Sequence, residues 1–208
     1  MIKIYYEDSE LLVCEKPYGI SSQKSEKENL VDILSEQIKS EIYPIHRLDI
    51  GTTGLIVYAK NQHSASSLSK QIVDRVFKKA YICLCHGITE KEGEMKDFLY
   101  HDRLKNKSFV VKNKRAGAKE AILEYSQIGA DTEKQLSLLK IRLHTGRTHQ
   151  IRVQLSSRGF PLYGDGKYGA RDNNKIRLHS CEIELINPKT KEKMLFKSLP
   201  EWAEAYSK

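Results

Sequence analysis

The feature that most constrains this chain is a turn bracketed by glycines that leads straight into an apolar run. Residues 46–49 (His-Arg-Leu-Asp) stand ahead of Gly51 and Gly54, and residues 55–59 read Leu-Ile-Val-Tyr-Ala. A continuous apolar run between turn residues predicts a buried strand. A carboxylate on the turn at the end of such a strand is a common arrangement in active sites, so Asp49 is the first candidate functional residue.

Short apolar runs separated by Gly, Pro, Asn and Asp recur along the rest of the chain. They predict many strands with few helices between them, which favours an antiparallel or mixed sheet over a repeated βαβ unit. The expected fold class is α+β, with a mixed, mainly antiparallel sheet and a few flanking helices. The sequence has no internal repeat and no Gly/Ser linker, so residues 1–208 are expected to form a single domain.

Apolar spacing also locates the individual elements. An amphipathic helix is expected over residues 30–38, with Asn29 as its N-cap, and a second helix over residues 63–76. A third helix is expected from about Thr148 to Gly159, a glycine that can cap its carboxyl end. Strands are expected at 11–14, 55–59, 80–87, 108–111, 121–128, 136–143, 176–186 and 194–197. Residues 112–119 are expected to be a solvated basic connection.

Composition narrows the partner class. Of the 208 residues, 35 are Lys or Arg and 27 are Asp or Glu, a net charge of +8 that suits either a polyanionic partner or ordinary solubility. These charges are spread along the sequence. The four cysteines are too few and too irregularly spaced for a disulfide framework or a paired zinc motif, so buried thiols are expected. The absence of a signal-like N-terminus and of a long apolar stretch leads us to expect a soluble, cytoplasmic protein.

A second informative segment lies far down the chain, at residues 143–155 (LHTGRTHQIRVQL). Together with residues 46–60 it resembles the two signatures of the RluA family of pseudouridine synthases, which isomerise uridine in structured RNA. The resemblance runs from residue 6 to about residue 169 and includes the Lys-Pro-Tyr-Gly turn at 16–19. The chain departs from the family pattern at Thr53, Gln154 and residues 21–23, and we expect it to act without the small helical RNA-binding domain that many relatives carry at the N-terminus.

The resemblance implies that Asp49 is the essential carboxylate. At the end of a buried strand it is partly desolvated, which favours the neutral acid, whereas a nucleophile must stay ionised. A cation is therefore needed nearby, and two unit charges ~4 Å apart at an effective dielectric of about 20 attract each other by roughly 4 kcal/mol. The plain alternative is that Asp49 only accepts hydrogen bonds from nearby amides.

Arg152 is the candidate cation. On a helix it lies about 60° from Leu155, which with Ile151 forms the buried edge, so it borders the core. In the family, by the resemblance, this arginine pairs with the catalytic aspartate, and its planar guanidinium suits a bidentate contact with a carboxylate. A surface arginine lying over apolar neighbours is the alternative.

The resemblance also assigns roles around the substrate. Arg47 is expected to fill the gap left by an extruded uridine, or simply to contact a phosphate. Tyr81 is expected to stack on the target base and to handle a proton late in the reaction. The other expected substrate-binding residues are His46, Leu48, Arg147, Leu143 and Ile151, the last two as pocket lining that core packing explains equally well.

Other interpretations of the sequence are weaker. The spacing of His46, His144 and His149 does not match a metal-binding pattern, so neither a metal nor a cofactor is expected, and a metal-dependent phosphodiesterase is a distant alternative. The glycine-rich segment 164–169 lacks the setting of a phosphate-binding loop and is expected to be structural. The main alternative is a non-catalytic RNA-binding or RNA-folding protein with the same fold. The protein is expected to be a monomer.

Overall fold

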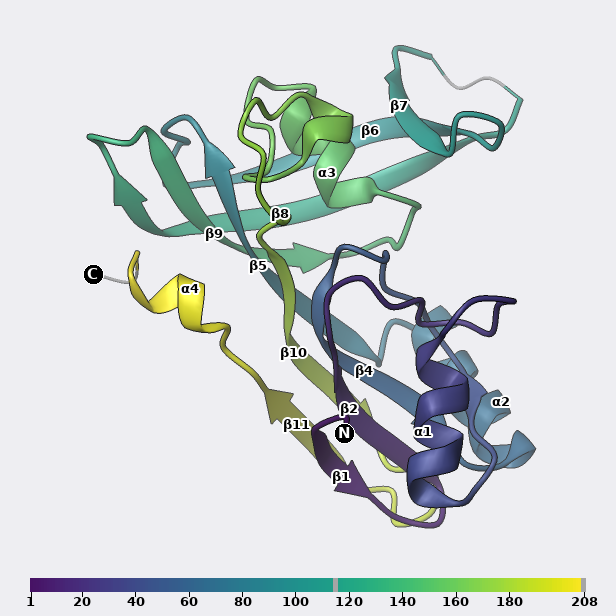
Figure 1. Ribbon diagram of the computed structural model, residues 1–208. Coiled ribbons are helices and arrows are strands. Elements are labelled where there is room, and N and C mark those ends of the chain that lie inside the picture. Colours follow the sequence, from purple (N-terminus) through teal and green to yellow (C-terminus); the bar gives the residue numbers. More distant parts are fainter. Residues whose placement is uncertain (114–115, 207–208) are drawn as a thin grey trace. The chain divides into compact units, whose positions relative to one another are not determined.

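The computed structural model describes residues 1–113 and 116–206. The chain divides into two compact units (Figure 1). Unit 1 comprises Met1–Ala80 and His179–Pro200, and unit 2 comprises Tyr81–Leu178 and Glu201–Lys208. The chain passes from unit 1 to unit 2 within one strand, after Ala80, and returns within another strand, before His179.

Unit 1 is built on a mainly antiparallel sheet. Its strands are β1 (Ile4–Glu7), β2 (Leu11–Lys16), β3 (Tyr43–Pro44), β4 (Thr53–Ala59), β10 (Leu178–Ile186) and β11 (Lys193–Lys197). They run in the order β1-β2-β4-β10, with β3 paired to β4 and β11 paired to β10. Strand β4 is antiparallel to β2 and parallel to β10, and six of its seven residues are buried. The expected buried strand at 55–59 is confirmed.

Two helices flank this sheet (Figure 1). Helix α1 (Leu30–Ile38) is capped by the Asn29 side chain, which accepts a hydrogen bond from the Asp32 amide at 3.1 Å, as predicted. Helix α2 (Gln62–Val73) ends three residues before the predicted end, because Arg75 takes a left-handed conformation with φ 60°. Leu68 from α2 packs with side chains of β2, β4 and β10 in the core of unit 1.

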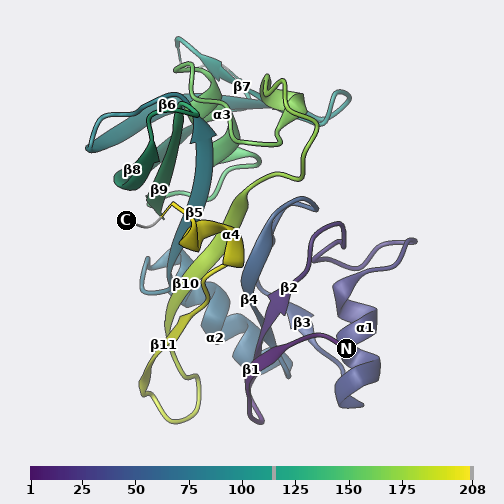
Figure 2. The same ribbon diagram turned by 60° about the vertical axis from the view of Figure 1, so that its left-hand side comes forward.

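The strands of unit 2 also pair in a mainly antiparallel way. Its strands are β5 (Lys78–His86, which begins in unit 1), β6 (Glu92–Asp102), β7 (Lys107–Val111), β8 (Ala118–Asp131) and β9 (Leu136–Leu143), in the order β5-β9-β8-β6-β7. Helix α3 (Gln150–Ser156) contacts β6 and β7, and both views show it beside them (Figures 1 and 2). A short 3-10 helix, η1 (Gly166–Tyr168), follows, and α4 (Glu201–Glu204) lies near the C-terminus. The α+β class with a mainly antiparallel sheet is confirmed.

Some elements were not predicted. Strand β6 was missed because only Met95 and Leu99 of its eleven residues are buried, so charged side chains hide the strand pattern. Strand β1 and helix α4 were also missed. The predicted basic connection at 112–119 joins β7 to β8, and residues 114–115 within it lie outside the described residues.

Two other expectations can be compared with the structure. All four cysteine thiols are buried and no disulfide links them, as predicted. Within residues 1–113 and 116–206, no helix combines the length and apolarity needed to cross a membrane.

Candidate active site

The turn that carries Asp49 is held by its own backbone and by neighbouring loops of unit 1. The Thr52 amide donates to the Asp49 carbonyl at 2.9 Å and closes the turn, and the Gly19 amide donates to the Ile50 carbonyl at 2.9 Å. The Ser22 hydroxyl accepts from the Leu48 amide at 3.1 Å and donates to the Leu48 carbonyl at 3.0 Å. These contacts fix the peptide groups on both sides of Asp49, whose side chain is half-buried.

A buried lysine lies beneath the same turn. The Lys16 ammonium donates to the carbonyls of Pro17, Ile50 and Thr52 at 2.9, 3.0 and 2.8 Å. Burial lowers the pKa of Lys16 to about 8, although the negative charge of Asp49 opposes that shift. The Lys-Pro turn and the Asp49 turn are therefore tied together by one side chain.

The start of β4 is fitted closely to β10. Gly54 has φ 103°, and a Cβ atom there would lie 2.4 Å from the Ser180 carbonyl oxygen, so only glycine fits. The Thr53 hydroxyl hydrogen-bonds the His179 ring at 2.8 Å, and the other ring nitrogen meets the Ser198 hydroxyl at 3.1 Å. Burial lowers the pKa of His179 to about 4, while Glu15 opposes this, so the ring is neutral at pH 7.

His46 and Arg47 have different surroundings. The His46 Nε2 atom accepts from the Val57 amide at 3.1 Å, and its ring lies 5.4 Å from that of Phe77. Burial, followed by the charge of Lys79, lowers the pKa of His46 well below its ordinary value. His46 therefore supports the turn as a neutral ring, whereas Arg47 is exposed and Leu48 is buried.

The second signature folds against the sheet of unit 2 through two buried glutamines. The Gln150 side chain accepts from the Thr145 hydroxyl and the Arg147 amide at 2.8 and 3.0 Å, and donates to the Ile122 carbonyl of β8 at 3.1 Å. The Gln154 amide group donates to the Asp97 carboxylate of β6 at 2.7 Å. Helix α3 therefore begins and ends on the sheet, and all of its first six residues are buried.

Arg152 is the charged residue of this buried helix. It is 7% exposed, and its Nε and Nη2 atoms donate to the two carboxylate oxygens of Asp165 at 2.7 and 2.8 Å. Its guanidinium carbon lies 5.0 Å from the centre of the Tyr168 ring. The expectation that Arg152 borders the core is confirmed, and Asp165 is a partner that sequence reasoning did not find.

The other predicted residues of unit 2 lie on three elements. Tyr81 is buried in β5, Leu143 is half-buried at the end of β9, and Ile151 is buried in α3. The Arg147 Nε atom donates to the Glu120 carbonyl at 2.8 Å. Among the described residues, no group of three or more His, Cys, Asp or Glu side chains is arranged to hold a metal ion.

The positive charge is divided unevenly between the two units. Unit 2 has 20 Lys or Arg against 13 Asp or Glu, a difference of +7, whereas unit 1 has 15 against 14, a difference of +1. The excess positive charge of the chain therefore lies almost entirely in unit 2. Unit 2 is the part of the chain suited to a polyanion.

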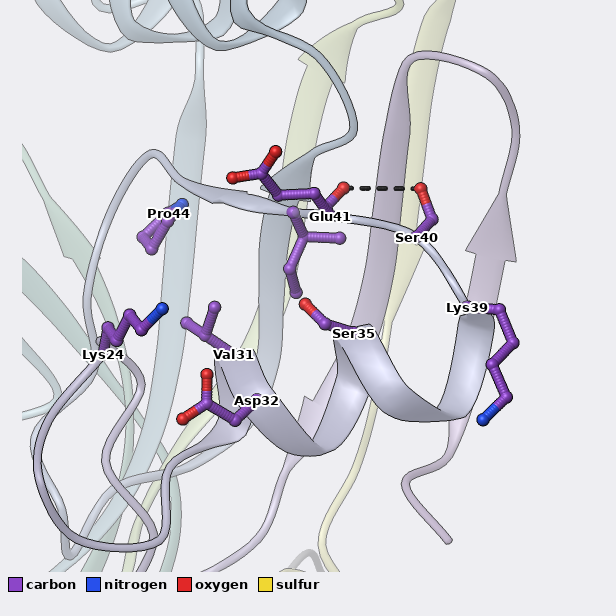
Figure 3. Close-up of a pocket in the computed structure, with 9 residues that line it drawn as sticks. Lys24, Val31, Asp32, Ser35, Lys39, Ser40, Glu41 and Pro44 are labelled. Carbon is purple, nitrogen blue, oxygen red and sulfur yellow. Dashed lines mark hydrogen bonds between the residues drawn. The ribbon is translucent and has the colours of Figure 1, made fainter.

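The pocket shown in Figure 3 belongs to unit 1 and has a volume of about 520 Å³. Helix α1, the following segment to Pro44, and Lys24 line it, and Ser40 donates to the Glu41 carbonyl at its rim at 3.5 Å. The Lys39 side chain points away from the other labelled residues, at the carboxyl end of α1 (Figure 3). None of the functional-site residues predicted from the sequence lines this pocket.

Comparison with known proteins agrees with these two signatures. The family described as RNA pseudouridylate synthase matches residues 10–157, which include Asp49, Tyr81 and Arg152. The chain is 31% identical over 203 residues to an uncharacterized RNA pseudouridine synthase, YhcT, of Bacillus subtilis, covering 92% of this chain and 66% of the relative. It is 33% identical over 217 residues to ribosomal large subunit pseudouridine synthase D of Borreliella burgdorferi, covering 96% and 65%. The chain belongs to the RNA pseudouridylate synthase family.

The fold comparison leads to the same family. Human RNA pseudouridylate synthase domain containing 1 superposes with a TM-score of 0.82 at 22% identity, covering 100% of this chain and 88% of that chain. At that identity the likeness concerns the fold. The chain spans just under two thirds of the length of the two curated bacterial relatives named above.

Proposed function

We propose that the protein is an RNA pseudouridine synthase that isomerises specific uridines in structured RNA, with Asp49 as the essential carboxylate. The family match over residues 10–157 carries the proposal. The geometry of unit 1 supports it, because Lys16 and Ser22 hold the peptide groups around Asp49 while the carboxylate stays half-buried. A fixed backbone on both sides of Asp49 lowers the cost of ordering its carboxylate during the reaction.

The proposed reaction is an isomerisation with no redox change. The bond between ribose C1′ and uracil N1 breaks, the uracil rotates within the site, and a new bond forms from C1′ to C5. The proton on C5 is released and a proton is placed on N1, so atoms and charge balance. Asp49 starts the reaction either by attacking the sugar or by removing a sugar proton. The proposal needs no cofactor.

The remaining roles follow the family resemblance. Arg152 keeps Asp49 ionised, Tyr81 stacks on the target base, and Arg47 contacts the neighbours of the extruded nucleotide. Leu48, Arg147, Leu143 and Ile151 complete the contacts with the substrate. We propose that residues 1–208 form a single catalytic domain.

The proposed partner is ribosomal or transfer RNA, and the protein acts as a monomer in the cytoplasm. The name of the Borreliella relative refers to the large ribosomal subunit, which favours ribosomal RNA as the first substrate to test. The excess of +7 in unit 2 supports binding of an RNA backbone there, because phosphate contacts release bound counterions.

The test compares Asp49→Asn with wild type on unmodified ribosomal and transfer RNA transcripts. Removing the carboxylate charge is expected to lower pseudouridine formation by at least about 10³-fold while RNA affinity is retained. The matched control is Asp74→Asn, which alters an exposed aspartate of unit 1 paired with Lys70 and is expected to keep full activity. Substantial product from Asp49→Asn contradicts the proposal, and binding without product from wild type favours the non-catalytic RNA-binding alternative.

A further inference from the structure

The loop that follows α3 carries Asp165, which binds the Arg152 side chain. Asp165 is fully buried and receives both hydrogen bonds of a side-on contact, from the Nε and Nη2 atoms of Arg152. A bidentate contact of this kind fixes the plane of a guanidinium as well as its position. The Tyr168 ring, 5.0 Å from the guanidinium carbon, restricts the same group further.

The loop is itself held in place by β5. The Tyr163 amide donates to the Leu84 carbonyl at 2.9 Å, and the His86 amide donates to the Pro161 carbonyl at 2.9 Å. Gly164 has φ 81°, and a Cβ atom there would lie 2.3 Å from the Lys175 carbonyl oxygen, so the chain is closely packed just before Asp165. The carboxylate of Asp165 is therefore presented from a rigid support.

The other side of the loop is fixed by Tyr168. Its hydroxyl accepts from the Ser108 amide of β7 at 2.8 Å and hydrogen-bonds His149 at 2.9 Å. The Ser156 hydroxyl at the end of α3 donates to the Tyr168 carbonyl. The loop that holds the Arg152 side chain is therefore itself hydrogen-bonded to β5, to β7 and to α3.

We infer that Asp165 is the positioning residue for Arg152, because its contact with Nε and Nη2 fixes the guanidinium plane and thereby sets the direction of the remaining N–H donors. Arginine has five N–H donors, and the two that face Asp165 lie on one edge of the plane. The remaining donors lie on the other edges. The glycine-rich segment 164–169, which the sequence suggests is merely structural, therefore acts on the active-site arginine. Only the kinetic arm of the test below rests on the proposed function.

The first arm measures the arginine directly. In ¹⁵N-labelled protein, the Nε–H signal of Arg152, assigned by its loss in Arg152→Lys, is expected to exchange slowly with water. Asp165→Asn removes one acceptor and the charge, and is expected to abolish this protection. Asp97→Asn is the matched control, because Asp97 makes a bidentate contact with Arg158, just after α3. It is expected to leave the Arg152 signal unchanged. A protected Arg152 signal in Asp165→Asn overturns the inference.

The second arm separates positioning from simple structural support. Asp165→Asn is expected to lower kcat for pseudouridine formation on unmodified RNA transcripts by about 10²-fold, as a misplaced catalytic group does, with KM unchanged. In an Arg152→Lys background the same change is expected to have no further effect on kcat. Losses that multiply in the double variant overturn the inference, because they show that Asp165 acts independently of Arg152.

Two further outcomes need their own interpretation, namely an Asp165→Asn variant that does not fold and a wild-type protein that forms no pseudouridine. If Asp165→Asn does not fold by circular dichroism, Asp165→Glu replaces it, since it keeps the charge and moves the carboxylate by one methylene group. It is expected to fold with an altered Arg152 signal and a lower kcat, and an unaltered signal counts against the inference. If the wild type forms no pseudouridine, the proposed function fails, whereas the Arg152 signal still decides the role of Asp165.

Discussion

The two signature segments are fixed by opposite means. Around Asp49 the support comes from backbone carbonyls and amides, with Lys16 and Ser22 as donors and acceptors, while the carboxylate itself stays half-buried. Around Arg152 the charged group is itself bound, by Asp165 within a buried cluster. In the proposed function Asp49 is the reacting group and has to be reachable by RNA, which fits its half-buried position, whereas Arg152 is held within the core of unit 2.

The two buried cations sharpen this contrast and give the largest expected effect on stability. Arg152→Met leaves the Asp165 carboxylate buried without its arginine, which is expected to cost about 3–5 kcal/mol. Lys16→Met removes three hydrogen bonds but also a buried charge, and is expected to cost about 1–3 kcal/mol. Urea unfolding followed by circular dichroism measures both. A larger loss for Lys16→Met contradicts the contrast.

The loss of stability in acid is a second property that distinguishes the two regions. The folded-state pKa of His179 in unit 1, about 4, lies below the ordinary value of 6.5. As the pH drops from 6.5 towards 4, His179 is protonated in the unfolded chain but not in the folded protein. The free energy of unfolding therefore falls over this pH range. At pH 5 the loss from this histidine is expected to be about 2 kcal/mol.

Denaturant titrations at pH 7 and pH 5 check that value. His179→Gln is expected to reduce the acid sensitivity by that amount, because glutamine does not titrate. The control is His144→Gln, at a half-exposed histidine of unit 2 near Glu124. Equal acid sensitivity in wild type and His179→Gln would show that His179 is not held neutral.

The smallest expected effect tests the uneven distribution of charge. Two triple variants each replace exposed lysines by glutamine, Lys105, Lys112 and Lys119 in unit 2, and Lys27, Lys39 and Lys189 in unit 1. The slope of RNA affinity against salt is expected to fall by about one for each lysine–phosphate interaction that the unit 2 variant removes. The unit 1 variant is expected to keep the wild-type slope. Equal changes of this slope in both triple variants would contradict the proposal that unit 2 is the main RNA-binding part.

Local patterns were sufficient for much of the fold. Asn29 caps α1 as predicted because a cap depends on residues only three positions apart, and β4 is apolar along its whole length. Strand β6 was missed because most of its side chains are only half-buried or exposed, so its sequence lacks the regular apolar spacing of a strand with one buried face. Element type follows from local spacing where one face of the element is buried, whereas a strand with only two buried side chains gives no such spacing.

The site divides in the same way. The positions of Asp49 and Arg152 on a turn and a buried helix followed from their own segments. Asp165 did not, because its contact joins a helix to a loop thirteen residues later, and a Gly-Asp-Gly sequence looks like an ordinary turn. The role of Lys16 could have been predicted only by asking which carbonyl groups accept hydrogen bonds from a buried lysine beside a proline turn. Long-range hydrogen bonds leave no periodic signal in the sequence.

The most direct test of the account is nucleotide-resolution mapping of pseudouridine in total RNA from a strain that lacks the gene. One or more uridines are expected to lose the modification in this strain. Wild-type protein is expected to restore them and Asp49→Asn is not, although both are present at equal levels. Full restoration by Asp49→Asn, or an unchanged pseudouridine map in the deletion strain, would contradict it.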